Sequence, residues 1–200
     1  MVEFDIEEKR YRFMEGQYLN AGGTEGVIYD IKGNKVAKIL RKINKNKTNK
    51  ILALCNKTEN LSSVKGFENI AMPLSPAYDL DQNICGFSMM YFKNCGPVND
   101  IVYDLQNKNY QNQKVNDSKV VEMIENLFFY LQLLHQNKII LGDLNAENIL
   151  WNINTNEVHY IDIDSSKVSG LNNIENEDGY YAEMYKAVSY THLTLPTKRI

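Results

Sequence analysis

Two short polar segments in the second half of the chain carry the residue types best suited to chemistry. The first is Leu141–Asn148, with the sequence LGDLNAEN, and the second is Tyr160–Asp164, with the sequence YIDID. Carboxylate and amide oxygens can place charge around a magnesium-bound triphosphate, which is most of what phosphoryl transfer requires of a protein. The competing interpretation is that Asp143 and Asn148 only cap a turn, because Asp and Asn are common turn residues.

A glycine-containing segment and a lysine-containing segment near the N-terminus could complete such a site. Ala21–Tyr29 reads AGGTEGVIY, and its glycines would let backbone N–H groups approach phosphate oxygens. A plain hairpin turn would use the same glycines equally well. The next segment, Lys35–Leu40, reads KVAKIL, and Lys38 is informative because it lies inside an apolar run. A solvent-facing lysine on an edge strand is the alternative for Lys38.

The order of these segments resembles that of a protein kinase. Leu141–Asn148 resembles the kinase catalytic loop H-R-D-L-x-x-x-N, and Tyr160–Asp164 resembles the metal-binding D-F-G that follows it. Ala21–Tyr29 is similar to the glycine-rich loop, with alanine replacing its first glycine, and Lys35–Leu40 is similar to the strand that supplies the phosphate-binding lysine. The resemblance covers roughly residues 18 to 166. The combination of VAKIL, IAMPL, ICGFSMM, GDLNAENIL and YIDIDSS looks like a group of bacterial protein-kinase-like proteins with a GDLN-type loop.

The resemblance implies a role for each of these residues, with ATP and Mg²⁺ as cofactors. Asp143 would orient the attacking hydroxyl and accept its proton, and Lys38 would be the second catalytic residue. Asn148 and Asp162 would hold magnesium. The residues implied to bind the nucleotide come from the glycine-rich loop, the lysine strand and the expected hinge region: Gly22, Gly23, Gly26, Lys38, Met89 and Tyr91. A methionine at position 89 is also an ordinary core residue, which is the alternative interpretation.

Three departures from the kinase pattern bear on mechanism. Gly142 stands where many kinases have an arginine that senses phosphate on the activation loop, so control by that route is not expected. Asp164 replaces the glycine of D-F-G, and would either add a metal contact or stiffen the turn. No acidic residue lies between positions 41 and 57, so Glu59 is the first candidate for an ion pair with Lys38.

The elements expected in the first half of the chain are mainly strands. Short apolar runs predict strands at Gln17–Ala21, Gly26–Ile31, Lys35–Leu40 and Ile84–Phe92. The turn Lys32–Asn34 contains glycine and predicts a β-hairpin between the second and third of these strands. A short helix is expected at Lys47–Lys57.

The second half changes to a helical pattern followed by a hairpin. From Ser118 to Gln136, apolar residues recur at three- and four-residue spacing, which predicts a helix with one buried face. The residues of that face are Val120, Val121, Ile124, Leu127, Phe128, Leu131 and Leu134. Two apolar runs, Ile149–Trp151 and Val158–Ile163, flank the Asn-rich turn Asn152–Asn156 and predict a second hairpin.

Strands in the first half of the chain, followed by a long helix in the second half, predict an α+β fold. With the kinase resemblance, we expect a two-lobed protein-kinase-like architecture: a nucleotide-binding lobe over residues 1–93 and a partial C-terminal lobe with the catalytic loop over residues 94–186. Nothing after Ser166 resembles an activation segment. We therefore expect a truncated C-terminal lobe in which the long helix lacks partners for part of its apolar face. Residues 187–200, AVSYTHLTLPTKRI, resemble a translated vector sequence and are expected to be a non-native tail.

Composition excludes several classes of partner. With 22 basic and 25 acidic side chains and a pI near 5.7, the chain has no positive field that would draw it onto nucleic acid or an anionic membrane. No stretch reaches the roughly 18 apolar residues of a membrane span. Cys55, Cys85 and Cys95 lie far apart, which predicts free thiols in a reducing compartment. We expect a cytoplasmic protein with neither nucleic acid nor membrane as a partner.

The leading functional hypothesis is a Ser/Thr-type protein kinase that moves the γ-phosphoryl group of ATP to a protein hydroxyl. A small-molecule kinase of the aminoglycoside or choline kinase type also uses a G-D-x-x-x-x-N loop and a later I-D motif, and its acceptor would be a small-molecule hydroxyl. The glycine-rich segment favours the protein kinase. A third hypothesis is a pseudokinase that binds nucleotide or a partner without catalysis, because the partner of Lys38 and the role of Asp164 are open.

Overall fold

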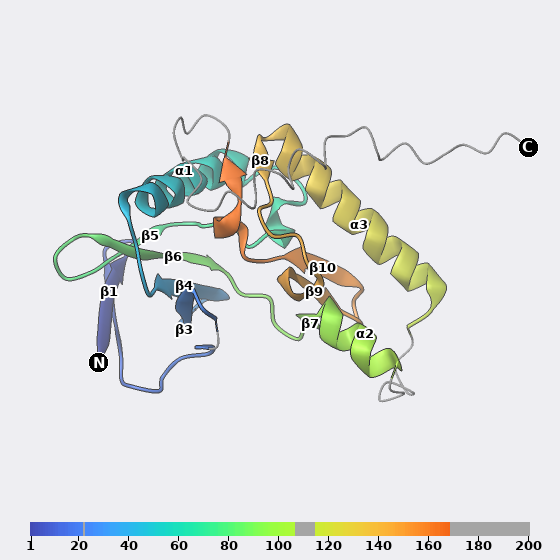
Figure 1. The fold of residues 1–200 in the computed structure, drawn as a ribbon, viewed down its shortest axis with the longest axis horizontal. Helices are drawn as coiled ribbons and strands as arrows, with labels where there is room; N and C mark the ends of the chain where they lie inside the picture. The colour runs from blue at the N-terminus through green and yellow to red at the C-terminus, as the bar shows by residue number, and fades with distance from the viewer. Residues whose placement is uncertain (22, 107–114, 169–200) are drawn as a thin grey trace, which may run out of the picture. The chain divides into compact units, whose positions relative to one another are not determined.

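An antiparallel sheet of six strands organises the N-terminal part of the structure (Figure 1). The computed structural model describes residues 1–21, 23–106 and 115–168. The strands lie in the order β2-β1-β5-β6-β4-β3, and each adjacent pair is antiparallel. Their bounds are β1 (Val2–Ile6), β2 (Lys9–Phe13), β3 (Gly26–Lys32), β4 (Lys35–Leu40), β5 (Pro76–Tyr78) and β6 (Ile84–Met90).

The predicted hairpin between β3 and β4 is confirmed. Its turn residues Lys32, Gly33 and Asn34 have φ angles of 68°, 65° and 58°. Glycine adopts this left-handed region without strain, and asparagine tolerates it better than most residues. Since Lys32 pairs with Lys35 across the turn, the register of β4 is fixed from its first residue.

The N-terminal hairpin of β1 and β2 was not predicted, whereas the strand predicted at Gln17–Ala21 is wrong. Among the described residues, its strand pairing is limited to an isolated bridge, from Asn20 to Ile28. The β1–β2 hairpin escaped prediction because its exposed positions are charged and hide the alternation of apolar residues. Those charges form cross-strand ion pairs, with Arg10 Nε at 2.8 Å from Asp5 Oδ1.

The two faces of the sheet pack against different partners. Side chains alternate across a strand, so Ala37 and Lys38 point to opposite faces. On the Ala37 face, a buried cluster contains Phe4, Ile6, Tyr29, Ile31, Ala37 and Ala77. On the opposite face, Phe87 packs with Ile51 and Cys55 of helix α1 (Lys45–Leu61). Helix α1 is longer than the predicted Lys47–Lys57, because Asn44 caps it by accepting a hydrogen bond from the Lys47 N–H.

The rest of the described chain combines two helices with short strands and single turns of 3₁₀ helix. The predicted hairpin is present as β9 (Ile149–Asn152) and β10 (Glu157–Tyr160), and β7 (Gly96–Pro97) pairs with β9. The remaining elements are α2 (Val98–Gln106), α3 (Asp117–Gln136), β8 (Ile139–Ile140), β11 (Lys167–Val168), η1 (Phe67–Asn69), η2 (Ala146–Asn148) and η3 (Ile163–Ser165). The fold is therefore mixed α+β with a mostly antiparallel sheet, as predicted.

Helix α3 is present as predicted, but its buried face shares only Leu134 with the predicted one. Its buried residues are Met123, Tyr130, Leu133 and Leu134, and the helix contacts β8 and β10. From the predicted face, Val121, Ile124 and Phe128 are exposed within the described part of the chain. The helix carries apolar residues on more than one side, and spacing alone does not show which side finds a partner. The expectation that part of its apolar surface would lack partners is confirmed for the described residues.

A backbone contact joins the β9–β10 hairpin to the segment that follows α1. The Ala71 N–H donates to the Tyr160 carbonyl at 2.8 Å, and Ile70 forms a parallel bridge with Tyr160. All described residues belong to one compact unit, Met1–Gly170. The lobe boundary near residue 93 stays a prediction, and the predicted tail at 187–200 lies outside the described residues. Among the described residues, no helix combines the length and apolar character needed to cross a membrane.

Candidate functional site

Lys38 lies in the middle of β4, inside the sheet. It pairs with Ile28 on β3 and with Phe87 on β6. Only 7% of Lys38 is exposed. Because β4 has a neighbouring strand on each side, the alternative of a solvent-facing lysine on an edge strand is wrong.

Two glycines hold the backbone of β4 in close contact with its neighbours. A Cβ atom on Gly86 of β6 would lie 2.1 Å from the Lys38 carbonyl oxygen, and one on Gly26 of β3 would lie 2.7 Å from the Ile39 carbonyl oxygen. Both distances are shorter than any side chain allows, so these positions require glycine. Gly26 was predicted to bind nucleotide, which stays a prediction, and its contacts show that packing also requires glycine there. Gly86 was not predicted at all, although a glycine inside a strand is a signal of close backbone approach.

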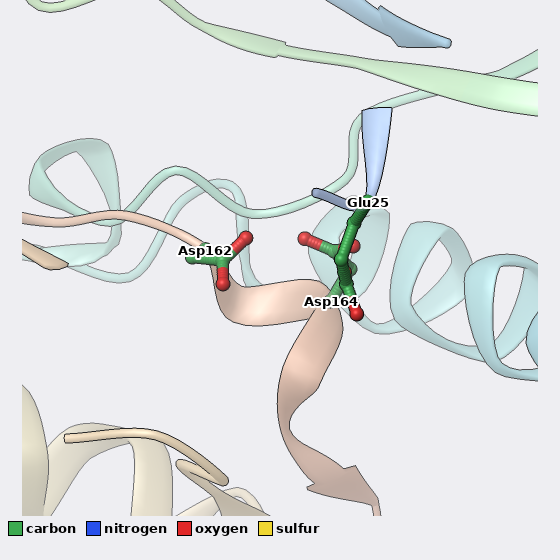
Figure 2. A group of neighbouring side chains, drawn as sticks. All are labelled: Glu25, Asp162 and Asp164. Atoms are coloured by element: carbon green, nitrogen blue, oxygen red, sulfur yellow. The ribbon is translucent and has the colours of Figure 1, made fainter. Parts of the chain in front are cut away.

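The Lys38 ammonium is surrounded by three carboxylates from two distant parts of the chain. Its Nζ atom donates to Asp162 Oδ1 at 2.6 Å and to the two carboxylate oxygens of Asp164 at 2.8 and 2.9 Å. Glu25 Oε2 lies 3.6 Å from the same nitrogen. Figure 2 shows Asp162 and Asp164 on one turn, with Glu25 on the segment that enters β3. Glu59, the first acidic candidate along the chain, is not among these partners, since it is exposed and near the end of α1.

The charges around Lys38 keep it protonated. Burial alone would lower the pKa of Lys38, but the negative charges of Asp164 and Asp162 outweigh burial and raise it. Lys50 of α1 lies within the electrostatic reach of the same acids, and burial lowers its pKa while the charges of Asp164 and Glu25 oppose that effect. Lys38 therefore offers a fixed positive charge, which suits the binding of phosphate oxygens.

A single turn of 3₁₀ helix positions Asp162 and Asp164 so that both carboxylates reach the Lys38 ammonium. Asp162 has a φ of 61° and precedes η3, and its carbonyl accepts hydrogen bonds from the Ser165 N–H and Oγ. Ile163, only 1% exposed, anchors the turn in the core. Aspartate tolerates the left-handed conformation better than most residues do. The Asp162–Asp164 segment is thus a defined turn and not a free loop.

The Asp143–Asn148 segment is held by its own polar side chains. Asn145 Oδ1 accepts from the Glu147 and Asn148 N–H groups at 2.8 and 3.1 Å, so Asn145 is the capping residue of η2. Asn148 Nδ2 donates to the Asp143 carbonyl oxygen at 3.1 Å and to its Oδ2 at 3.3 Å. Asp143 is exposed. Asp143 and Asn148 are in contact with each other, and the bond from the Asn148 amide to the Asp143 carbonyl also stabilises the turn, as the alternative interpretation predicts.

The backbone places the Asp143–Asn148 segment beside the Asp162 turn. Asn148 and Ile161 continue the β9–β10 hairpin by one step, because the Ile161 N–H donates to the Asn148 carbonyl at 3.0 Å. Asp162 follows directly. The hairpin therefore brings together the residues predicted to hold magnesium, and Asp162 in turn contacts Lys38 from the sheet.

The predicted glycine-rich loop is anchored by an arginine. Arg41 donates to the Ala21 carbonyl at 2.8 Å and to the Gly23 carbonyl at 3.5 Å, and its backbone N–H donates to the Glu25 carbonyl at 2.9 Å. A Cβ atom on Gly23 would meet only the Gly26 carbonyl, at an ordinary 3.6 Å. Gly23 is therefore not required by packing. Gly22 lies outside the described residues.

Met89 and Tyr91, the residues of the expected hinge region that were predicted to bind nucleotide, both have contacts within the protein. Met89 pairs with Val36, two positions from Lys38 on the same face of β4. Its side chain also packs against the cluster of Ile51, Cys55 and Phe87, so the structure fits the core interpretation as well as the binding one. The Tyr91 N–H donates to the Asn34 carbonyl at 2.8 Å and is thus engaged within the protein.

The oxygen donors near Asp162 fit a magnesium ion by their chemistry. Mg²⁺ prefers carboxylate and carbonyl oxygens, usually with one or two protein carboxylates and with substrate phosphates. Asp162 supplies a carboxylate that is 30% exposed. Because the Asn148 amide nitrogen is bonded to Asp143, its Oδ1 is the atom that could serve as a ligand. Oxygens of Glu25, Asp162 and Asp164 also lie within 4.8 Å of one another, with Lys38 Nζ among them.

Two cavities lie away from this site. One, of about 410 Å³, is lined by Arg12, Phe13, Gln17, Tyr18, Leu19 and Asp30. The other, of about 270 Å³, is lined by Ile6, Glu7, Lys9, Tyr11, Ile31, Lys32, Gly33, Lys35 and Ser88. Neither contains a predicted site residue, so the candidate site is defined by its polar contacts and not by these cavities.

The cysteines take no part in the site. Cys55, Cys85 and Cys95 are free thiols, as predicted. Burial raises the pKa of Cys55 to about 12 and that of Cys85 to about 11, which keeps both thiols protonated and poorly nucleophilic.

Sequence reasoning missed Glu25 and the contact of Asp164 with Lys38. Glu25 lies inside the glycine-containing segment, where only its position just before β3 hints that it could reach a residue on β4. Comparison with known proteins adds no candidates: no protein-family model matches the chain, and no curated protein matches it. The functional inference therefore depends on the geometry of Lys38, Asp143, Asn148 and Asp162.

Proposed function

We propose that this chain is an ATP-dependent phosphotransferase with a two-lobed, protein-kinase-like fold, which moves the γ-phosphoryl group of ATP to a serine or threonine hydroxyl of a protein. The observation that carries the proposal is the contact between Lys38 and Asp162. These residues are 124 positions apart, and Lys38 Nζ donates to Asp162 Oδ1 at 2.6 Å. A buried lysine facing the acid of an I-D segment, beside an Asp–Asn loop, is the charge arrangement that phosphoryl transfer needs.

Each residue has a chemical task in the proposed reaction. Lys38 would bind phosphate oxygens through its fixed positive charge. Asp162 and Asn148 would hold Mg²⁺, which when bound neutralises charge on the phosphates. Asp143 is exposed and lies in contact with Asn148, so its carboxylate could orient an incoming hydroxyl and accept its proton. Asp162 would then exchange its contact with Lys38 for one with the metal.

Nucleotide binding by the full chain is the first test. Calorimetry with a non-hydrolysable ATP analogue, with and without Mg²⁺, would compare the native chain with Lys38→Ala and Asp162→Ala. Binding should be stronger with Mg²⁺, and both substitutions should weaken it. Lys35→Ala is the matched control, because Lys35 lies on the same strand and pairs with Glu7, away from Lys38. A native chain that is folded by circular dichroism and binds no nucleotide would contradict the proposal.

The acceptor is tested by transfer of labelled γ-phosphate to a panel of proteins and small-molecule alcohols. Label on serine or threonine supports the protein kinase. Label on a sugar or amino alcohol, with none on protein, would instead identify a small-molecule kinase of the aminoglycoside or choline kinase type.

A specific observation also favours a non-catalytic alternative. Lys38 already has three carboxylates around it, and the Tyr91 N–H is bonded to Asn34, so groups that kinases use for nucleotide are engaged within the protein. A pseudokinase would keep these contacts. Nucleotide binding without phosphate transfer to any acceptor would support this alternative.

A further inference from the structure

Helix α1 lies on the same face of the sheet as Lys38, but its charges near the site are positive. It packs through Ile51 and Cys55 against Phe87, which pairs with Lys38. Its residue Lys47 lies 3.4 Å from Glu25, and the charge of Lys50 interacts with Asp164 and Glu25. In protein kinases a glutamate of the corresponding helix pairs with the strand lysine. Here the helix supplies cations, so the acid for Lys38 must come from elsewhere.

The two aspartates that contact Lys38 differ in how they do so. Asp164 places both carboxylate oxygens within hydrogen-bond distance of Nζ, at 2.8 and 2.9 Å, and its side chain is 8% exposed. Asp162 uses one oxygen, and its side chain is 30% exposed. Asp162 can therefore turn toward a metal, while Asp164 stays with the lysine. The positive charges of Lys47 and Lys50 offset the extra acids around Lys38.

We propose that Asp164 is the positioning residue that holds Lys38 in place for nucleotide phosphates, in the role that a helix glutamate has in protein kinases. The inference rests on the proposed function and adds to it. Since Asp162 and Asp164 belong to the same anchored 3₁₀ turn, one turn positions both the lysine and the metal ligand. The orientation of the Lys38 side chain for phosphate binding then depends on this turn and not on an acidic residue of α1.

The test compares Asp164→Asn with Asp162→Asn in the full chain. Affinity for an ATP analogue is measured with EDTA and with Mg²⁺. Asp164→Asn should weaken metal-free binding about 10- to 100-fold, because Lys38 is then no longer held in one orientation toward the phosphates, and should keep the enhancement by Mg²⁺. Asp162→Asn should do the reverse: metal-free binding persists, and the enhancement is lost. A merely structural role for Asp164 would not produce this crossed pattern.

Two outcomes would overturn the proposal. Asp164→Asn could leave metal-free affinity unchanged, or it could abolish the Mg²⁺ enhancement, which would make Asp164 a metal ligand. If Asp164→Asn does not fold by circular dichroism, Asp164→Glu decides, because it keeps the charge. Its metal-free affinity should then stay well above that of Lys38→Ala, and an equal loss in both variants would contradict the proposal.

A nucleotide-free measurement separates failure of this inference from failure of the proposed function. The rate at which an amine-acylating reagent labels Lys38 is followed by peptide mass spectrometry. Asp164→Asn should raise the labelling rate more than Asp162→Asn does, because Asp164 makes two of the contacts that shield the ammonium. This result in a chain that binds no nucleotide would keep the lysine–aspartate assignment and reject the kinase function. Equal rates in both variants would reject the assignment itself.

Discussion

The Asp143–Asn148 segment and the cluster around Lys38 lie side by side in the proposed site, but they are built in different ways. The first is largely exposed, and the side-chain hydrogen bonds seen there in the described structure join residues no more than five positions apart. In the second, the side chains of Lys38 and Asp164 are buried, and the hydrogen bonds join residues 124 and 126 positions apart. A local segment can change its chemistry without affecting the fold, whereas a cluster formed by long-range packing ties chemistry to stability. The predictions below test that difference.

The largest expected effect is on catalysis in the local segment. Asp143→Asn should reduce phosphate transfer by about 10²- to 10⁴-fold, the usual range for loss of a general base. The asparagine oxygen can still accept the hydrogen bond from Asn148 Nδ2, so the melting temperature and the affinity for the ATP analogue should stay near the native values. Transfer rates, thermal unfolding and calorimetry would be measured on one preparation. A large loss of stability would show that this segment is not independent of the core.

Stability should respond most strongly in the Lys38 region. Gly86→Ala would place a Cβ atom 2.1 Å from the Lys38 carbonyl oxygen, so the strands must move apart. We expect a loss of about 3 kcal/mol in the free energy of unfolding, at the upper end for overpacking of a core. Denaturation by urea measures it. Gly23→Ala is the control, since its Cβ would have only an ordinary contact at 3.6 Å, and a similar loss there would contradict this explanation.

This difference also explains what the sequence could predict. The β3–β4 hairpin, α3 and the β9–β10 hairpin follow from local spacing and turn residues, and each is present. The contact of Asp143 with Asn148 lies within the predicted loop. Local patterns of this kind are visible in a single chain because the residues that form them are neighbours in sequence.

The partners of Lys38 could not be predicted in this way. Asp164 and Glu25 reach Lys38 only because the sheet and the η3 turn bring three distant segments together. Glu59, the nearest acid along the following helix, was a candidate by sequence order alone and is not among the partners of Lys38. Most of the buried face of α3 was misjudged for the same reason, since tertiary contacts select between its apolar sides, and only Leu134 is common to both.

A smaller effect is expected from the cap that shapes the local segment. Asn145→Ala removes the acceptor for the Glu147 and Asn148 N–H groups and should cost about 1 kcal/mol in the free energy of unfolding. It should also lower phosphate transfer, because Asn148 loses part of its support. Asn44→Ala, which removes the cap of α1, is the matched control. It should cost a similar free energy and leave transfer unchanged, and equal losses of transfer in both variants would argue against a specific role for the cap.

The smallest effect concerns an aromatic contact outside these two regions. Phe92, which follows β6, stacks on His159 of β10 with ring centroids 3.8 Å apart. Burial lowers the pKa of His159 below its ordinary 6.5, although the charge of Glu157 and a hydrogen bond with the Asn69 backbone oppose this. Its Nδ1 atom has no hydrogen-bond partner within the described structure. The folded state therefore favours the neutral ring.

The sign of the pH dependence follows from this shift. As pH falls below 6.5, the unfolded chain takes up a proton at His159 before the folded chain does, so the folded protein loses stability. His159→Phe keeps a ring against Phe92 and should flatten the decline in unfolding free energy between neutral and mildly acidic pH. The decline should not vanish, because burial also lowers the pKa of His135. Urea denaturation at several pH values measures both curves, and identical slopes would mean that the pKa of His159 is the same in the folded and unfolded chains.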